Sequence, residues 1–267
     1  MDKTDTEGTS DQLKGRRLLV GDLHGNLFGL QQALDECDFN YGVDELYSIG
    51  DLCDGWYMTP EVIDLLMQIP NFTLVLGNHE KYLMEYLFSA NIHPDWRANG
   101  GQATIDAYSM IPSDMREKHR RFLNTGHYYY ILDEYLLVHG GYDWRIPLAE
   151  NVWSHGNNNI FTWDRELWEK VWKIETSPKY EIKFLPTKDD FKKIFIGHTA
   201  IGHLNNYEPI QACQVWNIDT GGGSEGKVTI IDMDTEEWWQ SEMAVDIYEQ
   251  SERAHIFKQH MKKYNDK

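Results

Sequence analysis

Five short polar motifs, each directly after an apolar run, constrain this chain more than any other feature of its sequence. They are Gly21-Asp22-Leu23-His24-Gly25, Gly50-Asp51-Leu52-Cys53-Asp54, Gly77-Asn78-His79-Glu80, His139-Gly140-Gly141 and Gly197-His198-Thr199. Short apolar runs bounded by glycine and polar residues are typical of buried strands that end in loops. The pattern therefore predicts a sheet with carboxylates and imidazoles at its strand ends.

The first half of the chain alternates between strand and helix signals. Residues 18–20, 45–49 and 72–76 are expected strands, and each is followed by apolar residues at helical spacing. Thr59-Pro60 resembles a helix start, with proline at the first helical position. This alternation favours a parallel sheet covered by helices.

The pattern changes after residue 90. Residues 91–125 are polar and broken by proline and glycine, which predicts a partly helical insertion. A hairpin is expected from two runs on either side of Asp133-Glu134, at 128–132 and 135–138. Further strands are expected at 194–196, 215–218 and 228–231. The second half is therefore β-rich, and we expect an α/β fold in which one sheet packs on another with helices outside.

One catalytic domain, residues 16–233, accounts for these elements. Residues 1–15 are polar, acidic and aperiodic, so we expect a disordered tail. Residues 234–267 are expected to form a C-terminal helical extension that covers a core edge through Met243, Ile247 and Tyr248. Docking of this extension to a partner is the alternative.

Composition narrows the classes of partner and compartment. The formal net charge of −18 over 267 residues argues against stable binding of nucleic acid, which needs clustered Lys and Arg. The sequence has no apolar run of about 18 residues and no hydrophobic secretory segment, so no membrane association is expected. Three scattered cysteines suit a reducing compartment, and we expect the cytoplasm.

Two of the motifs can hold metal ions at neighbouring positions. Asp22 and His24 alternate along one extended stretch, so both side chains point the same way and reach one ion. Asp51 follows the next strand and can bridge two ions about 3.5–4 Å apart, as two-metal hydrolases require. In open α/β sheets the ligand crevice lies beyond the carboxyl ends of the strands, where both motifs fall.

The remaining motifs supply side chains that would complete the coordination of the second ion. Asn78, His139 and His198 offer one carbonyl oxygen and two imidazoles. A mixed oxygen and nitrogen set without cysteine suits manganese, iron or zinc better than calcium. A glycine precedes a proposed ligand at four positions, which permits a sharp turn and close backbone approach. These are Gly21, Gly50, Gly77 and Gly197.

Together the motifs resemble the calcineurin-like metallophosphoesterases, and most closely the serine/threonine phosphoprotein phosphatases of the small bacterial and phage (lambda phosphatase) type. The similarity runs from Arg16 to Met233. Three further segments share it: Asn99-Gly100-Gly101, Trp163-Asp164-Arg165-Glu166 and Ile218-Asp219-Thr220-Gly221. The resemblance implies a four-layer α/β/β/α sandwich with two packed mixed sheets. It also implies two divalent metal ions, manganese first and iron or zinc as alternatives.

The resemblance also implies a role for each motif residue. The implied metal ligands are Asp22, His24 and Asp51 for the first ion, and Asp51, Asn78, His139 and His198 for the second. His79 matches the general acid, which Asp54 would hold protonated, while metal-bound hydroxide attacks phosphorus in line. Asn78 and Arg165 match residues that contact the phosphate.

Three positions depart from the family pattern. Gly55 stands where the family has an arginine after the aspartate, with Trp56 next to it in place of glycine, and Leu76 stands where a second arginine precedes the third motif. Losing guanidinium contacts weakens the grip on a dianionic monoester. The nearby cations that could replace them are Lys81, Arg97 and Arg145.

Three functions follow from these residues. The first is hydrolysis of phosphomonoesters, as a serine/threonine or dual-specificity protein phosphatase acting on phosphorylated protein or a small phosphoester. The second is hydrolysis of nucleotides, dinucleoside polyphosphates or phosphodiesters, with Trp56, Tyr57 or Tyr142 stacking on a base. The third is an inactive binding module, against which the complete set of ligand positions argues.

Overall fold

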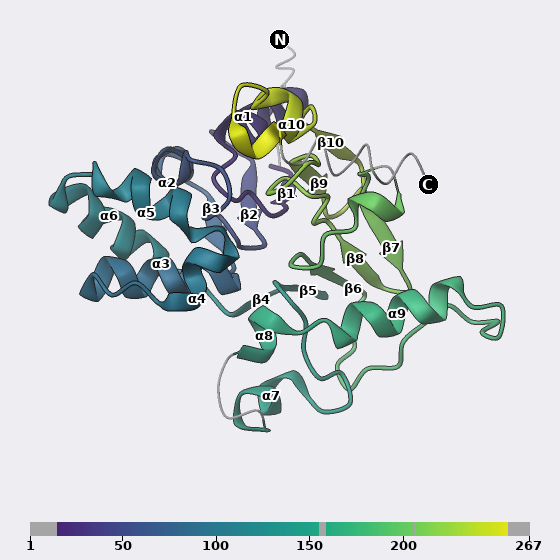
Figure 1. The fold of residues 1–267 in the computed structure, drawn as a ribbon. Coiled ribbons are helices and arrows are strands. Elements are labelled where there is room, and N and C mark those ends of the chain that lie inside the picture. Colours follow the sequence, from purple (N-terminus) through teal and green to yellow (C-terminus); the bar gives the residue numbers. More distant parts are fainter. Residues whose placement is uncertain (1–14, 155–158, 206, 256–267) are drawn as a thin grey trace, which may run out of the picture.

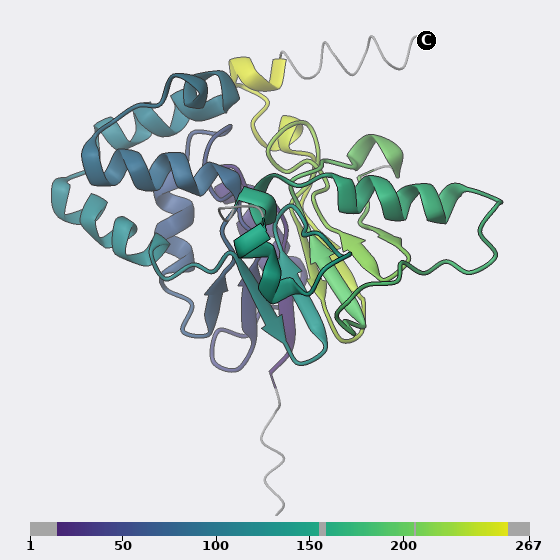
Figure 2. The same ribbon diagram turned by 90° about the horizontal axis from the view of Figure 1, so that it is seen from below.

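Two five-stranded sheets lie face to face with helices on both outer sides, as Figures 1 and 2 show. The computed structural model describes residues 15–154, 159–205 and 207–255. The predicted α/β sandwich with two packed mixed sheets is confirmed. The expected tail over 1–15 lies outside the described residues, apart from Gly15.

The first sheet holds the three strands predicted in the first half of the chain. In sheet order its strands are β10 (Trp238–Gln240), β9 (Thr229–Asp232), β1 (Arg17–Val20), β2 (Glu45–Ser48) and β3 (Phe72–Leu74). β1, β2 and β3 are parallel, whereas β9 runs antiparallel to β1. Its outer face packs against α1 (Leu27–Glu36) and α2 (Thr59–Leu66), and α3 (Asn78–Ser89) follows β3. The carboxyl ends of the parallel strands therefore share one edge.

The second sheet contains the predicted hairpin. In sheet order its strands are β4 (Tyr129–Leu132), β5 (Tyr135–Val138), β6 (Lys193–Ile196), β8 (Val215–Asn217) and β7 (Ile210–Ala212). β4 and β5 pair antiparallel, as expected, while β7 was not predicted. The helices after β5 are α7 (Leu148–Ser154), α8 (Asn159–Trp163) and α9 (Glu166–Thr176), and apolar residues of all three join the core on this side.

The segment over 91–125 is helical along most of its length. It forms α4 (Pro94–Trp96), η1 (Arg97–Gly101), α5 (Gln102–Ser109) and α6 (Ser113–Leu123). α5 packs on α2 and α6 packs on α3, so these helices lie together beside the first sheet (Figure 1). None of the described helices combines the length and the apolar character that a bilayer crossing requires.

The predicted C-terminal helical extension begins instead with a strand. β10 pairs with β9, and Trp239 packs against the core of the first sheet. Adjacent aromatic residues favour a strand, and helical spacing starts only at Met243. A short helix, α10 (Ala244–Ile247), then lies beside α1 (Figure 1). Residues 256–267 of the predicted extension lie outside the described residues, and the 16–233 domain boundary stays a prediction.

The two sheets meet through a fully apolar layer. Leu19 and Ile49 from the first sheet and Leu137 and Phe195 from the second are completely buried there. Large side chains in such a layer fix how the sheets lie on each other, because interiors are close-packed. The layer therefore fixes how the ends of β1 and β2 lie relative to those of β5 and β6.

Replacing Phe195 by alanine should destabilise the whole fold. Removing a buried phenylalanine side chain costs about 3–5 kcal/mol, because apolar contacts are lost and a cavity remains. Urea unfolding followed by far-UV circular dichroism would measure the change. Ile131→Ala is the matched control, because Ile131 is 50% exposed on β4, and a comparable loss in both variants would contradict this account of the layer.

Candidate functional site

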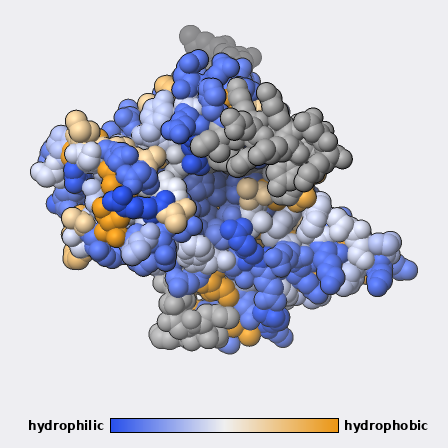
Figure 3. All heavy atoms as spheres, in the orientation of Figure 1, coloured by the Kyte–Doolittle hydropathy of each residue, from blue (hydrophilic) through white to orange (hydrophobic). Residues whose placement is uncertain are grey.

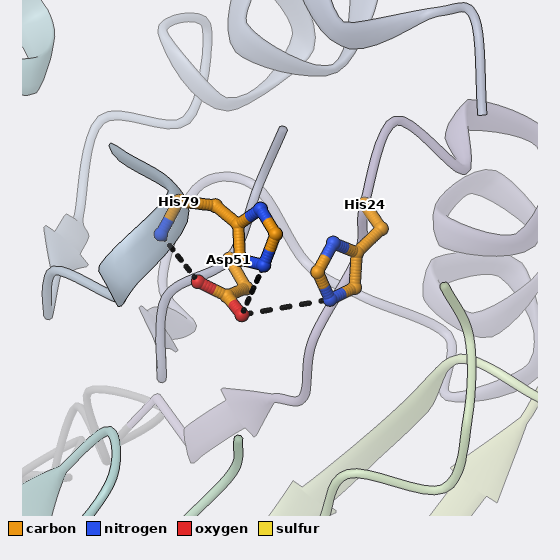
Figure 4. Close-up of side chains that lie close together, drawn as sticks. All are labelled: His24, Asp51 and His79. Carbon is orange, nitrogen blue, oxygen red and sulfur yellow. Dashed lines mark hydrogen bonds and ion pairs between the residues drawn. The ribbon is translucent and has the colours of Figure 1, made fainter. Parts of the chain in front are cut away.

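Residues from the ends of both sheets converge on the carboxylate of Asp51, which follows β2. Its Oδ2 atom lies 3.5 Å from His24 Nε2, 3.3 Å from His139 Nε2 and 3.8 Å from His79 Nε2. Figure 4 shows His24 and His79 on either side of this carboxylate. Asp51 belongs to two groups whose ligand atoms all lie within 4.8 Å, one with His24 and His79 and one with His139 and His198. A shared carboxylate is what a bridged pair of ions needs.

The other predicted ligands lie in the same place. Asp22 Oδ2 is 4.0 Å from His24 Nε2 and accepts a hydrogen bond from the backbone N–H of His198. Asn78 Oδ1 is 3.2 Å from His139 Nε2. The structure thus brings all six predicted ligand residues together. They come from four strand ends, after β1, β2, β5 and β6, and from the start of α3.

His79 also lies within reach of the first group, but its environment separates it from the ligands. Its Nδ1 is 2.6 Å from Asp54 Oδ2, the same oxygen that accepts the indole N–H of Trp96 at 2.7 Å. Burial alone would lower the pKa of His79, but Asp51 and Asp54 raise it to about 9. A protonated imidazole suits a proton donor and not a metal ligand, so the predicted pairing of His79 with Asp54 agrees with the geometry.

Glu80 holds the loops that carry these side chains. Its carboxylate accepts the backbone N–H groups of Asp51, Leu52 and Gly77, each at 2.7–2.8 Å. His24 and Asp51 adopt left-handed φ angles of 49° and 51°, which are uncommon for residues with side chains. Glu80 was not among the predicted site residues, although its place in the third motif was the available signal.

Two of the predicted glycines are required by close approach. A Cβ atom at Gly197 would lie 2.1 Å from Asp22 Oδ1, and one at Gly77 would lie 2.1 Å from Asp51 Oδ1. Real side chains do not approach so closely. Glycine at these positions therefore lets each carboxylate pack against the backbone of a neighbouring loop.

The buried charges of the site fit divalent cations. Burial, with Asp219 and Asp51 nearby, raises the pKa of Asp22 well above its ordinary value. Burial lowers the pKa of His198 to about 3, which leaves a neutral imidazole able to act as a ligand. Asp22 Oδ1 and His198 Nε2 are buried without a hydrogen-bond partner among the described residues. Buried polar atoms are normally paired, so these two oxygen and nitrogen donors are suited to metal ions.

A polar pocket of about 270 Å³ opens over the predicted ligands. Figure 3 shows that the middle of this face is hollowed and hydrophilic. Arg165, at the start of α9, lines the pocket and donates from Nη1 to the carbonyl of His198 and the hydroxyl of Thr199. Arg253 lines it too. Arg253 was not predicted as a site residue, because no motif lies near it.

The three suggested replacement cations point elsewhere. Lys81 donates to Asn159, Arg97 to Gln102, and Arg145 to both Asp143 and Glu166. None of Lys81, Arg97 and Arg145 is among the described residues that line the pocket.

The suggested stacking aromatics are also placed differently. Trp56 and Tyr142 are buried, and Tyr57 is exposed but does not belong to the described pocket lining. The aromatic side chain at the pocket is Trp163, which is 42% exposed and lies edge-on to His198. Burial of Trp56 and Tyr142 in loop packing removes them as partners for a base.

Comparisons with known proteins agree with the fold and site. A model of the calcineurin-like phosphoesterases matches residues 15–219. Serine/threonine-protein phosphatase 2 of Escherichia coli (strain K12) is 27% identical, over 79% of this chain and 89% of its own. The symmetrical bis(5'-nucleosyl)-tetraphosphatase of Neisseria meningitidis serogroup A is 24% identical, over 84% and 95%. A solved structure assigned provisionally as a diadenosine tetraphosphatase has a TM-score of 0.58 at 16% identity, over 86% of this chain and 94% of that one, and it supports the fold alone.

The chain belongs to the calcineurin-like phosphoesterase family, which confirms the resemblance drawn from the motifs. It is a metal-dependent phosphoester hydrolase, and the family uses divalent metal ions. The inactive binding module is thereby set aside.

Gly197→Ala should weaken metal binding, because the new methyl group would displace the Asp22 carboxylate. Groups that orient metal ligands typically change affinity about 10–100-fold, and we expect a loss of that size for manganese in titration calorimetry. Gly42→Ala, in an exposed loop, is the control. Unchanged manganese affinity in Gly197→Ala would rule out Asp22 as a ligand held by this contact.

Proposed function

We propose that this protein is a phosphomonoesterase that acts on phosphoserine and phosphothreonine in proteins, with manganese as its preferred ion. Asp22, His24 and Asp51 are the proposed ligands of one ion, and Asp51, Asn78, His139 and His198 those of the other. The observation that carries the proposal is the Asp54–His79 pair beside the shared carboxylate of Asp51. A proton donor next to a two-ion site is what removal of an alkoxide requires.

Four residues at the site have separate parts in the proposed reaction. When bound, the two ions supply Lewis acidity and an activated water. Asp54 accepts the Nδ1–H of His79, which leaves Nε2–H to protonate the departing oxygen of the substrate. Arg165 and the amide of Asn78 bind and orient the phosphoryl group.

A protein substrate is supported by the surface next to the pocket. A second hollow of about 370 Å³ shares Trp163 with the site and is lined by Asp143, Asp164 and Glu166 against one cation, Arg145. Arg145 pairs with Asp143 and Glu166, but the hollow keeps a net negative charge, which would repel the phosphate chain of a dinucleoside polyphosphate. It favours a polypeptide with basic residues beside its phosphorylated side chain.

Symmetrical dinucleoside tetraphosphate hydrolysis is the second candidate. It is supported by the exposed indole of Trp163 at the pocket, which offers a face for stacking a base, and by the relative from N. meningitidis. In the first candidate function the acidic hollow binds basic residues of a polypeptide, whereas in the second Trp163 stacks on a base.

A substrate panel with manganese separates the candidates. A phosphoserine peptide flanked by arginine should have a kcat/KM about two- to fivefold above that of the same peptide flanked by glutamate, the size expected of exposed ion pairs. Glu166→Lys should reduce this preference. Diadenosine tetraphosphate should be the poorer substrate. If it is hydrolysed faster than either peptide, and Trp163→Ala abolishes that advantage, the dinucleotide function replaces ours.

His79→Asn should lower kcat most for substrates whose leaving oxygen must be protonated. General acid catalysis is worth about 10²–10⁴-fold, so we expect that loss of kcat for a phosphoserine peptide. The loss should be much smaller for p-nitrophenyl phosphate, because p-nitrophenolate leaves readily without protonation. Equal losses for both, at unchanged manganese affinity, would contradict the role of His79.

A further inference from the structure

The guanidinium of Arg253 reaches the site from the end of the described chain. This residue follows α10 and lines the same pocket as Arg165. Its Nη2 donates to the carbonyl of Gly223 at 2.6 Å, and its guanidinium lies over the ring of Trp56, 5.2 Å from the centroid. A hydrogen bond and a cation–π contact thus hold the head group at the pocket wall.

The space that this head group uses exists because residue 55 is glycine. Gly55 has φ of +91°, and a Cβ atom there would lie 3.1 Å from Arg253 Nη2 and 3.2 Å from His24 Cβ. Any side chain at this position would crowd the guanidinium. Gly55 is also the position where the family has an arginine. The guanidinium of Arg253, from a distant part of the chain, lies beside this position.

Trp56, the second departure at this motif, anchors the segment that carries Arg253. Its indole stacks on Tyr248, with ring centroids 4.6 Å apart and planes 13° apart, and donates to the carbonyl of Gly222 at 2.8 Å. Ala244, Val245 and Ala254 complete this small buried cluster. The two neighbouring replacements therefore act together, one making room for the guanidinium and the other fixing the segment that brings it.

We propose that Arg253 binds the phosphoryl group of the substrate, so that the C-terminal segment supplies the second guanidinium of the active site. A guanidinium carries several N–H donors in a planar fork, a geometry that matches the oxygens of a phosphoryl group. A monoester dianion offers several acceptor oxygens. With Arg165, the pocket then presents two guanidinium groups to a doubly charged substrate. The inference rests on the proposed monoesterase function.

The test compares full-length Arg253→Ala and Arg253→Lys with the parent protein and with Arg121→Ala, a matched control on the exposed side of α6. Titration calorimetry on manganese-loaded protein measures the affinity for inorganic phosphate. Steady-state assays measure kcat/KM for p-nitrophenyl phosphate and its bis ester, and melting temperatures report the fold. The alanine variant is also assayed with added guanidinium chloride at concentrations that leave the parent active.

We expect Arg253→Ala to lower phosphate affinity and monoester kcat/KM about 10–100-fold, the usual range for a lost charge-assisted bond. The singly charged diester should be affected less, the lysine variant should fall between, and guanidinium should restore part of the monoester activity. Arg121→Ala should match the parent.

Three outcomes would overturn the assignment: a phosphate affinity within threefold of the parent, equal losses for both esters, or a lowered melting temperature with no recovery by guanidinium. If the parent hydrolyses no monoester while Arg253→Ala still loses phosphate affinity, the monoesterase function fails and the phosphate contact stands.

Discussion

The carboxylate of Asp51 is the group on which the rest of the site depends. It is buried, it faces imidazoles from both halves of the fold, and its backbone is held in a left-handed turn by Glu80. Burial alone would raise its pKa, but His139 and His79 hold that pKa well below its usual value. Burying an anion costs free energy unless the anion is paired. Here the paired groups are imidazoles whose residues follow different strands.

The local sequence predicted the parts of the molecule that depend on short-range patterns. Each proposed ligand lies in a motif that follows an apolar run and contains a glycine, so the five motifs located the strand ends and the six side chains that meet there. The pairing of His79 with Asp54 came from the family resemblance. β10 was missed because its three residues depend on pairing with β9 and on packing of Trp239, neither of which leaves a periodic signal.

Long-range contacts explain what the sequence could not locate. Gly55 and Leu76 stand at positions where the family has arginines, and the replacement cations that the sequence suggested all lie near the motifs. Arg253 lies far from Gly55 in the sequence, and the Trp56–Tyr248 stack, together with the small buried cluster around it, brings the two residues together. An arginine that is missing from a motif can therefore be replaced by an arginine from a distant segment, and a comparison of the motif alone does not include that segment. The same contacts give the C-terminal segment a place beside the active site.

The proposed ligands are divided between the two sheets. Asp22, His24 and Asp51 follow strands of the first sheet, and His139 and His198 follow strands of the second. Ions bound by both sets would cross-link the halves at one end of the apolar layer that contains Phe195. Binding to the native state alone adds its free energy to folding stability, so metal occupancy and cohesion of the sandwich become linked equilibria. An apo chain would therefore be expected to open first along the edge where catalysis takes place.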